Sequence, residues 1–408
     1  MTATQEKDGT GTLKRRKPDA GPQTTKGRAG RFDACADAED FRVRASRRLP
    51  RMVFDYIDGA AGRESTADRN LSALRKVALC PNILQDVSRV DTSCRLFGQP
   101  SRLPIVIAPT GLNGAYWHQG DLALARAAKA SGIPFVMSTA ACVTLDDMHR
   151  TAGPLRWFQL YMFKDKALAL SLLERVWQYG FEVLELTVDT PVGGYRNRDI
   201  RNGFSLPFRW SLPKLWDVAR HPRWTAQMLA GGLPTLKLFA EVVGPIPAGE
   251  TITAVMNQQL SSTFDWQDLA WLRRHWPGKL VLKGVGCAAH AVAAQREGID
   301  GVVVSNHGGR QLDGSVSSVE SLPEIVQAVG GGMVILIDSG FRSGTDVAKA
   351  IALGADGVQL GRAVLYALAA GGEAAVRRML DIMRVELHSA MAMTGSTGIA
   401  ALRGKATA

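Results

Sequence analysis

The sequence predicts an α/β fold, a (β/α)8 TIM barrel with an insertion after the fourth strand and a disordered, basic N-terminal tail. From about residue 100 onward, eight short apolar runs alternate with helical patterns, and each run is continuous rather than alternating in polarity. Continuous runs are typical of parallel strands buried on both faces. Eight strand–helix units match the count of this barrel. A doubly wound open sheet is the alternative.

The expected strands are read from these runs in chain order. Several runs follow a glycine, such as Gly132 in KASGIP, that is suited to the left-handed C-cap of the preceding helix. The eight runs are Leu103–Ala108, Ile133–Met137, Trp157–Tyr161, Val183–Val188, Leu280–Lys283, Gly301–Val304, Val334–Ile337 and Gly357–Leu360.

Composition and charge place residues 1–38 apart from the barrel at 39–408. The chain has 408 residues and a net charge of +11, but residues 1–31 alone carry eight lysines and arginines against three acids. We therefore expect a disordered tail and no nucleic-acid partner. The pair Arg15 and Arg16 is followed by no apolar segment of an export signal. The five scattered cysteines indicate neither disulfides nor a metal site and favour a reducing, cytoplasmic location.

The segment 190–279 is too long for a simple loop and helix between the fourth and fifth strands, so we expect an insertion that covers the catalytic face. Within it, residues 207–244 combine Trp210, Trp216 and Trp224 with basic residues that include Arg209. Tryptophans suit lipid headgroups and basic side chains suit anionic lipid, which predicts a peripheral membrane segment. A lid or a subunit contact is the alternative.

The ends of the expected strands carry the candidate chemistry, because active sites of TIM barrels lie at the carboxyl ends of the strands. His307, in SNHGGRQLD, is a candidate general base that Asp189 would orient, although a lone histidine is often structural. Arg310 and Arg196 would bind a carboxylate.

A phosphate site is expected after the seventh and eighth strands, where DSGFR and GR place Gly340, Arg342, Gly361 and Arg362. Lys283 ends a buried strand and needs an anion or an electron-rich ring near it. A Schiff-base role or an ion pair with Asp189 is the alternative.

These motifs together resemble the FMN-dependent L-2-hydroxy-acid oxidising family, and most closely its mandelate dehydrogenase and flavin L-lactate dehydrogenase branches. The resemblance extends from about residue 40 to 395 and rests on LPRMVFDYIDGAAG, APTGLNGAYW, WFQLY, LTVDTP, SNHGGRQLD, DSGFRSGTD and LGRAVLYALA. Ser339 stands where the family often has glycine, and the C-terminal end looks short after Gly395, which leaves subunit contacts open.

The resemblance implies roles for individual residues. Catalytic and substrate-binding roles are implied for Tyr56, Tyr161, Arg196, His307 and Arg310, with Asp189 catalytic through His307. Contact with the FMN cofactor is implied for Pro109, Thr110, Gly111, Ser138, Gln159, Thr187, Lys283, Ser305, Asp338, Ser339, Gly340, Arg342, Gly361 and Arg362.

The implied reaction is the oxidation of an L-2-hydroxy acid to the 2-oxo acid. Ala140 and Gly111 leave room for an aryl substrate such as mandelate, with lactate next. Gly111 and the insertion favour a quinone or respiratory-chain acceptor over oxygen. We further expect a homotetramer attached peripherally to the inner face of the cell membrane. An oxygen-using oxidase, an FMN-barrel isomerase and a catalytically silent binding barrel are the alternatives.

Overall fold

The computed structural model describes residues 32–205, 208, 210–244 and 250–407. The chain divides after Ala34, and a large compact unit begins at Cys35. Its first helix, α1 (Ala38–Arg48), is capped by Asp37, whose side chain accepts a bond from the Asp40 amide at 3.0 Å. The expected disordered tail therefore ends before residue 38, and its first 31 residues lie outside the described part.

Eight parallel strands close into a barrel in the order β10-β11-β4-β5-β6-β7-β8-β9, which confirms the TIM-barrel prediction. The strands are β4 (Ile105–Ile107), β5 (Phe135–Ser138), β6 (Arg156–Leu160), β7 (Val183–Thr187), β8 (Lys279–Val285), β9 (Gly301–Val304), β10 (Val334–Ile337) and β11 (Gly357–Leu360). Every expected run overlaps one of them, and β5, β6 and β8 extend beyond their runs by one to three residues. The first strand begins later than Leu103 because Pro104 has no backbone N–H to donate to a neighbouring strand.

Helices surround the barrel and follow the strands in the expected alternation. They are α4 (Gly120–Ser131), α5 (Leu145–Thr151), α6 (Lys166–Gln178), α12 (Trp266–His275), α13 (Ala288–Arg296), α14 (Ser318–Val329), α15 (Gly344–Ala352) and α16 (Arg362–Met393). Gly132 ends α4 with φ 65°, as its sequence context predicted. The barrel core is apolar at the amino ends of the strands, where Trp157, Val183, Val281 and Leu336 belong to one buried cluster.

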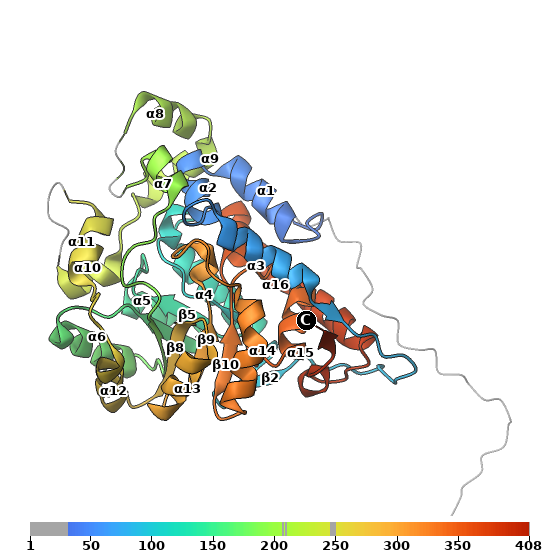
Figure 1. Cartoon of the computed structure of the whole chain (residues 1–408). Coiled ribbons are helices and arrows are strands. Elements are labelled where there is room, and N and C mark those ends of the chain that lie inside the picture. Colours follow the sequence, from blue (N-terminus) through green and yellow to red (C-terminus); the bar gives the residue numbers. More distant parts are fainter. Residues whose placement is uncertain (1–31, 206–207, 209, 245–249, 408) are drawn as a thin grey trace, which may run out of the picture. The chain divides into compact units, whose positions relative to one another are not determined.

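In the described residues before the barrel, the helices are α1, α2 (Arg51–Asp58) and α3 (Ser65–Lys76). Helix α1 packs against α16, and Figure 1 shows α1–α3 running along that side of the barrel. Smaller elements complete this unit: the pairs β1 (Ala78–Leu79) with β12 (Ala406–Thr407) and β2 (Cys94–Leu96) with β3 (Gln99–Ser101), and the 3-10 turns η1 (Asn113–Ala115), η2 (His307–Gly309) and η3 (Ile399–Leu402).

The described residues of the insertion form five helices between β7 and α12. They are α7 (Asn197–Asn202), α8 (Leu212–Ala219), α9 (Pro222–Gly231), α10 (Lys237–Val243) and α11 (Ile252–Gln259). Helix α7 packs against α2 and α8 against α9, so the insertion and the N-terminal helices meet at one end of the barrel (Figure 1). Within the described residues, no helix has the length and apolar character needed to cross a membrane.

Candidate active site

A cavity of about 500 Å³ opens at the carboxyl ends of the barrel strands. Its lining includes most of the residues that the sequence singled out. These are Tyr56, Pro109, Thr110, Gly111, Ser138, Tyr161, Lys283, Arg196, His307, Arg310, Asp338, Ser339, Gly340, Arg342, Gly361 and Arg362. Strands from all parts of the sequence therefore contribute to one site.

Four expected site residues lie behind this lining instead of on it. Gln159 accepts a hydrogen bond from the Ser138 hydroxyl at 2.9 Å and donates one to Thr187 at 3.0 Å. The Ser305 hydroxyl accepts bonds from the Lys283 ammonium at 3.2 Å and from the His307 amide at 3.0 Å. Asp189 contacts the ring of His307. These four hold groups that face the cavity.

The period of a β-strand explains why polar groups gather here. Side chains two residues apart point to the same side of a strand. Val136, Val183 and Val281 belong to the apolar barrel core. The residues two positions further along each strand, Ser138, Glu185 and Lys283, are therefore also interior but lie nearer the cavity. The carboxyl-terminal layers of the barrel are polar for this reason.

His307 is positioned by its ring and by its backbone. Its Nδ1 lies 3.0 Å from Asp189 Oδ1, which leaves Nε2 as the nitrogen available to a substrate. Burial alone would raise the pKa of Asp189, but the neighbouring His307 and Lys283 outweigh burial, so this pKa is lowered. The backbone of His307 has φ 58°. The Ser339 hydroxyl fixes the next residue by accepting a bond from the Gly308 amide at 3.0 Å.

Lys283 pairs with a different carboxylate from the one that the sequence analysis considered. Its ammonium forms an ion pair with Asp338, whereas Asp189 bonds to His307. Burial opposes the charge of Lys283, but Asp338 and then Glu185 raise its pKa, so the lysine stays protonated. Asp338 therefore has a second role, as counter-ion, besides the cofactor contact that the resemblance implied.

Two arginines and a tyrosine form the opposite wall. The guanidinium carbons of Arg196 and Arg310 lie 5.6 and 5.1 Å from the ring centroid of Tyr56. The Tyr56 ring also stacks on Phe204 at 4.5 Å, so an insertion residue fixes its orientation. Burial and Asp189 raise the pKa of Tyr161, which keeps that phenol neutral and able to donate a proton in a hydrogen bond.

The expected phosphate end of the cavity contains small residues and two cations. A side chain added at Gly361 would meet nothing within 4 Å, so the backbone there is open to a ligand. Arg342 and Arg362 line the same cavity, and the Arg362 guanidinium bonds to the carbonyl of Gly308. Burial lowers the pKa of Arg362 to about 10, so the guanidinium remains charged at neutral pH. These residues fit a phosphate dianion.

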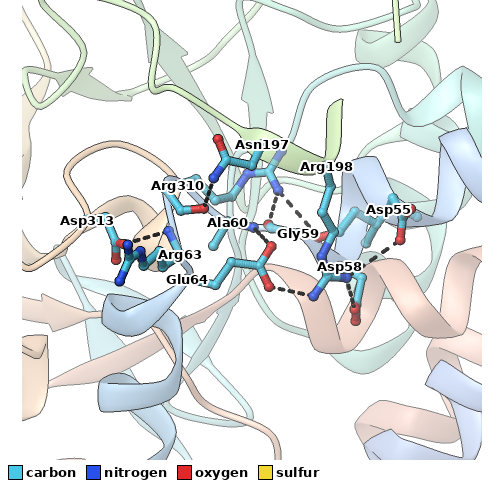
Figure 2. A network of polar contacts seen from close by, with 12 residues as sticks. Asp55, Asp58, Gly59, Ala60, Arg63, Glu64, Asn197, Arg198, Arg310 and Asp313 are labelled. Atoms are coloured by element: carbon cyan, nitrogen blue, oxygen red, sulfur yellow. Dashed lines mark hydrogen bonds and ion pairs between the residues drawn. The ribbon is translucent and has the colours of Figure 1, made fainter. Parts of the chain in front are cut away.

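A polar network ties the N-terminal helices to the active-site loops (Figure 2). Arg310 donates to the carbonyl of Gly59 at 2.7 Å, and the Asn197 amide donates to the carbonyl of Gly62 at 2.6 Å. Arg198 bonds to Asp58 at 2.9 Å and also pairs with Glu64. The turn after α2, which follows Tyr56, is therefore held by the insertion and by the loop after β9.

The sequence analysis did not identify several residues of the site. Val192, Tyr195 and Ile200 line the cavity and are exposed, so they form an apolar rim at its mouth. Glu185 and Gln359 lie inside the barrel and hydrogen bond to each other at 2.5 Å. An acidic residue inside the apolar run VLELT was a visible signal for Glu185, whereas nothing in the sequence identifies its partner.

The expected membrane segment 207–244 divides into a buried and an exposed part. Trp224 is only 1% exposed and donates to the carbonyl of Ala115 at 2.8 Å, so it does not face lipid. Trp216 is 69% and Leu212 83% exposed on α8. Positions 207 and 209 lie outside the described residues. A tryptophan pattern alone does not distinguish a buried indole from an exposed one.

The chain matches the family model described as FMN-dependent dehydrogenase over residues 45–408. It is 41% identical to (S)-mandelate dehydrogenase of Pseudomonas putida, covering 90% of this chain and 92% of that protein. It is 44% identical to L-lactate dehydrogenase of Caulobacter sp. (strain K31), covering 87% and 94%.

Two solved structures are also similar to this chain in fold and sequence. The crystal structure of the monotopic membrane protein (S)-mandelate dehydrogenase superimposes with a TM-score of 0.86 at 39% identity, covering 92% of this chain and 99% of that one. The crystal structure of mandelate oxidase has a TM-score of 0.77 at 34% identity, covering 91% and 98%.

Proposed function

Since this chain belongs to the FMN-dependent dehydrogenase family, we propose that it oxidises an L-2-hydroxy acid of the mandelate type, with lactate as the next candidate, to the 2-oxo acid. The observation that carries the proposal is the His307–Asp189 pair, at 3.0 Å, in a cavity that Arg196 and Arg310 also line. A base beside two carboxylate-binding cations suits this substrate class.

FMN is the cofactor, and the cavity fits it by the chemistry of its donors. We assign Pro109, Thr110, Gly111 and Ser138 to the ring, with Gln159 and Thr187 behind Ser138, and Lys283 to the ring atoms that gain charge. Asp338 would contact the ribityl chain, with Ser305 behind the lining as the acceptor of a Lys283 hydrogen bond, and Ser339, Gly340, Arg342, Gly361 and Arg362 would contact the phosphate. When bound, FMN accepts the two electrons of the reaction.

The residues of the opposite wall then bind the substrate and take its proton. Arg196 and Arg310 bind the carboxylate, and the hydroxyl groups of Tyr56 and Tyr161 hydrogen bond to the substrate. His307 Nε2 takes a proton, and Asp189 stabilises the resulting imidazolium because it stays ionised. The same residues serve whether the proton leaves the carbon or the hydroxyl.

A quinone in the membrane is the proposed electron acceptor. The exposed apolar rim of Val192, Tyr195 and Ile200 suits an apolar acceptor at the cavity mouth. Exposed Leu212 and Trp216 on α8, with Arg220 and Arg223 nearby in the sequence, suit an anionic lipid surface. These residues support peripheral attachment to a membrane, and we place that attachment at the inner face of the cell membrane as part of the proposal. We also propose that the protein is a homotetramer.

One experiment tests substrate and acceptor together. Purified yellow protein is mixed anaerobically with mandelate, lactate, glycolate and longer acids, and flavin bleaching is timed. We expect the fastest bleaching with mandelate. A soluble quinone analogue should then restore the colour much faster than oxygen does. Faster reoxidation by oxygen would favour the oxidase alternative, and no bleaching with any acid would overturn the proposed function.

A further inference from the structure

A buried carboxyl group under the cavity has no assigned role. Glu185 is 0% exposed on β7 and does not line the cavity, whereas its partner Gln359, on β11, does. Both residues lie inside the barrel, and Gln359 Nε2 donates to Glu185 Oε2 at 2.5 Å. Because β7 and β11 are four strands apart in either direction around the closed barrel, this bond crosses the barrel interior.

The hydrogen bonding between Glu185 and Gln359 is incomplete, and a proton on Glu185 would complete it. Among the buried polar atoms of the described residues, Glu185 Oε1 and Gln359 Oε1 both lack a partner. Both are acceptors if Glu185 is ionised, so neither can satisfy the other. A proton on Glu185 Oε1 would supply the donor that the pair lacks, and a carboxylic acid and an amide are complementary in this way. A buried polar group without a partner is costly, which favours the protonated form.

Burial and the neighbouring charges have opposing effects on the pKa of Glu185. Burial raises its pKa to about 7, against the favourable charge of Lys283 on β8. Asp338, directly after β10, and Asp189, two residues after β7, act in the same direction as burial. The interior residues from β6 and β11, Gln159 and Gln359, carry no charge. Val183, one interior layer below, belongs to the apolar core.

We propose that Glu185 is a proton-holding positioning residue for the flavin: it carries a proton when negative charge is added above Lys283 and releases it when that charge is withdrawn. The inference rests on the proposed placement of Lys283 beside the flavin. The reaction delivers two electrons to the cofactor, and the proton on Glu185 comes from solvent and returns to it, so the substrate chemistry is unchanged. Glu185 acts only through the charge that Lys283 and the cofactor experience.

The expected signature is a dependence on pH. When Glu185 is ionised, its charge opposes reduction of the flavin, and when it is protonated this opposition disappears. The flavin midpoint potential of Glu185→Gln should therefore equal that of the wild type near pH 5.5 and lie above it increasingly toward pH 8.5. The amide should be tolerated, because it keeps an acceptor and brings a donor to Gln359 Oε1.

The experiment measures the midpoint potential of the holoenzyme against pH for wild type, Glu185→Gln and Glu182→Gln. Glu182 is an exposed acid just before the same strand, so its variant controls for loss of one negative charge and should follow the wild type. Wild type should also take up a larger fraction of a proton upon anaerobic reduction near pH 7 than Glu185→Gln does, as read with an indicator dye.

Three results would overturn the inference. One is a pair of wild-type and Glu185→Gln curves that stay parallel at all pH values, as a purely structural role requires. A second is an equal shift in Glu182→Gln. If Glu185→Gln does not retain FMN, the reduced-minus-oxidised infrared spectrum of the wild type decides, and absence of a carboxyl protonation band near pH 7 would count against us. A wild type that binds no FMN is a separate case, because that result would overturn the proposed function itself.

Discussion

Pairing between charged side chains decides the chemistry at the scale of single residues. Asp189 is committed to His307 and Asp338 to Lys283, so one carboxylate supports the base and the other supports the lysine that we assign to the cofactor. Removal of either member of the Lys283–Asp338 pair leaves a buried charge without compensation, which is strongly destabilising. Each of these residues can therefore be tested through the group that it supports.

His307→Gln should keep bound FMN and lose most turnover. A positioned base contributes roughly 10²- to 10⁴-fold to the rate, and glutamine cannot take the proton. Stopped-flow anaerobic flavin reduction measures the loss directly, and flavin absorbance reports cofactor retention. Reduction at nearly the wild-type rate would show that His307 is not the base.

Arg310→Met should raise KM and slow flavin reduction. A hydrogen bond to a charged group contributes about 1.5 to 3 kcal/mol, so kcat/KM should fall roughly 10- to 100-fold. Arg310→Lys is the matched control, because it keeps the charge but loses the bond geometry, and it should recover part of the activity. An equal loss with the acid and with its uncharged amide would mean that Arg310 acts through its bond to Gly59 and not through the carboxylate.

At the scale of elements, one aspartate joins four helices. Asp58, at the end of α2, bonds to Arg42 of α1 at 2.6 Å, to Arg198 of α7 at 2.9 Å and to the hydroxyl of Tyr366 of α16 at 2.8 Å. Burial would raise the pKa of Asp58, but these three partners outweigh burial and lower it. Helix α2 also contains Tyr56, so this aspartate anchors the helix that carries a site residue.

Asp58→Asn should lower the free energy of unfolding at neutral pH by on the order of 2 kcal/mol, because charged hydrogen bonds are lost while the arginines are partly exposed. Since the folded pKa of Asp58 is lowered, its stabilisation is present above the unfolded value of about 3.9 and is lost as pH falls below it. The difference between the two melting temperatures should therefore narrow below about pH 4. Asp68→Asn, at an exposed site on α3, should melt like wild type at every pH; a similar drop there, or a pH-independent gap for Asp58→Asn, would contradict this assignment.

The insertion matters at the scale of the whole molecule, because it connects the active site with the surface. Leu236 and Phe204 from the insertion line the cavity, and α8 presents its apolar side chains outward. Removing all of residues 207–244 would therefore disturb the cavity and the buried Trp224 as well as any membrane contact. A sharper experiment changes only exposed side chains of α8.

The variant Leu212→Ser, Leu215→Ser, Trp216→Ser should remain in the supernatant with anionic liposomes, whereas wild type should sediment. Wild type should detach as salt rises, because screening acts over about 8 Å at physiological ionic strength. Ile83→Ser, Leu84→Ser changes exposed apolar residues outside the insertion and should sediment like wild type. Both variants should keep FMN and activity with an artificial acceptor. Wild type that stays in the supernatant at low salt would contradict membrane attachment.

The sequence by itself determined the barrel and the kinds of residue at its mouth. Eight continuous apolar runs predict strands buried on both faces, and the strand period places Ser138, Lys283 and Asp338 on the interior face near the carboxyl ends. These features follow from the spacing of residue types along the chain, which can be read directly from the sequence.

Only the tertiary structure decided which of these groups are partners. The ion pair of Lys283 with Asp338 and the bond of Glu185 to Gln359 both join strands that are distant in sequence. Such contacts depend on the closure of the barrel and on side-chain rotamers, about which the local pattern carries no information. The burial of Trp224 has the same origin. Its indole donates a hydrogen bond to the carbonyl of Ala115, which is distant in sequence, so the local segment does not reveal it.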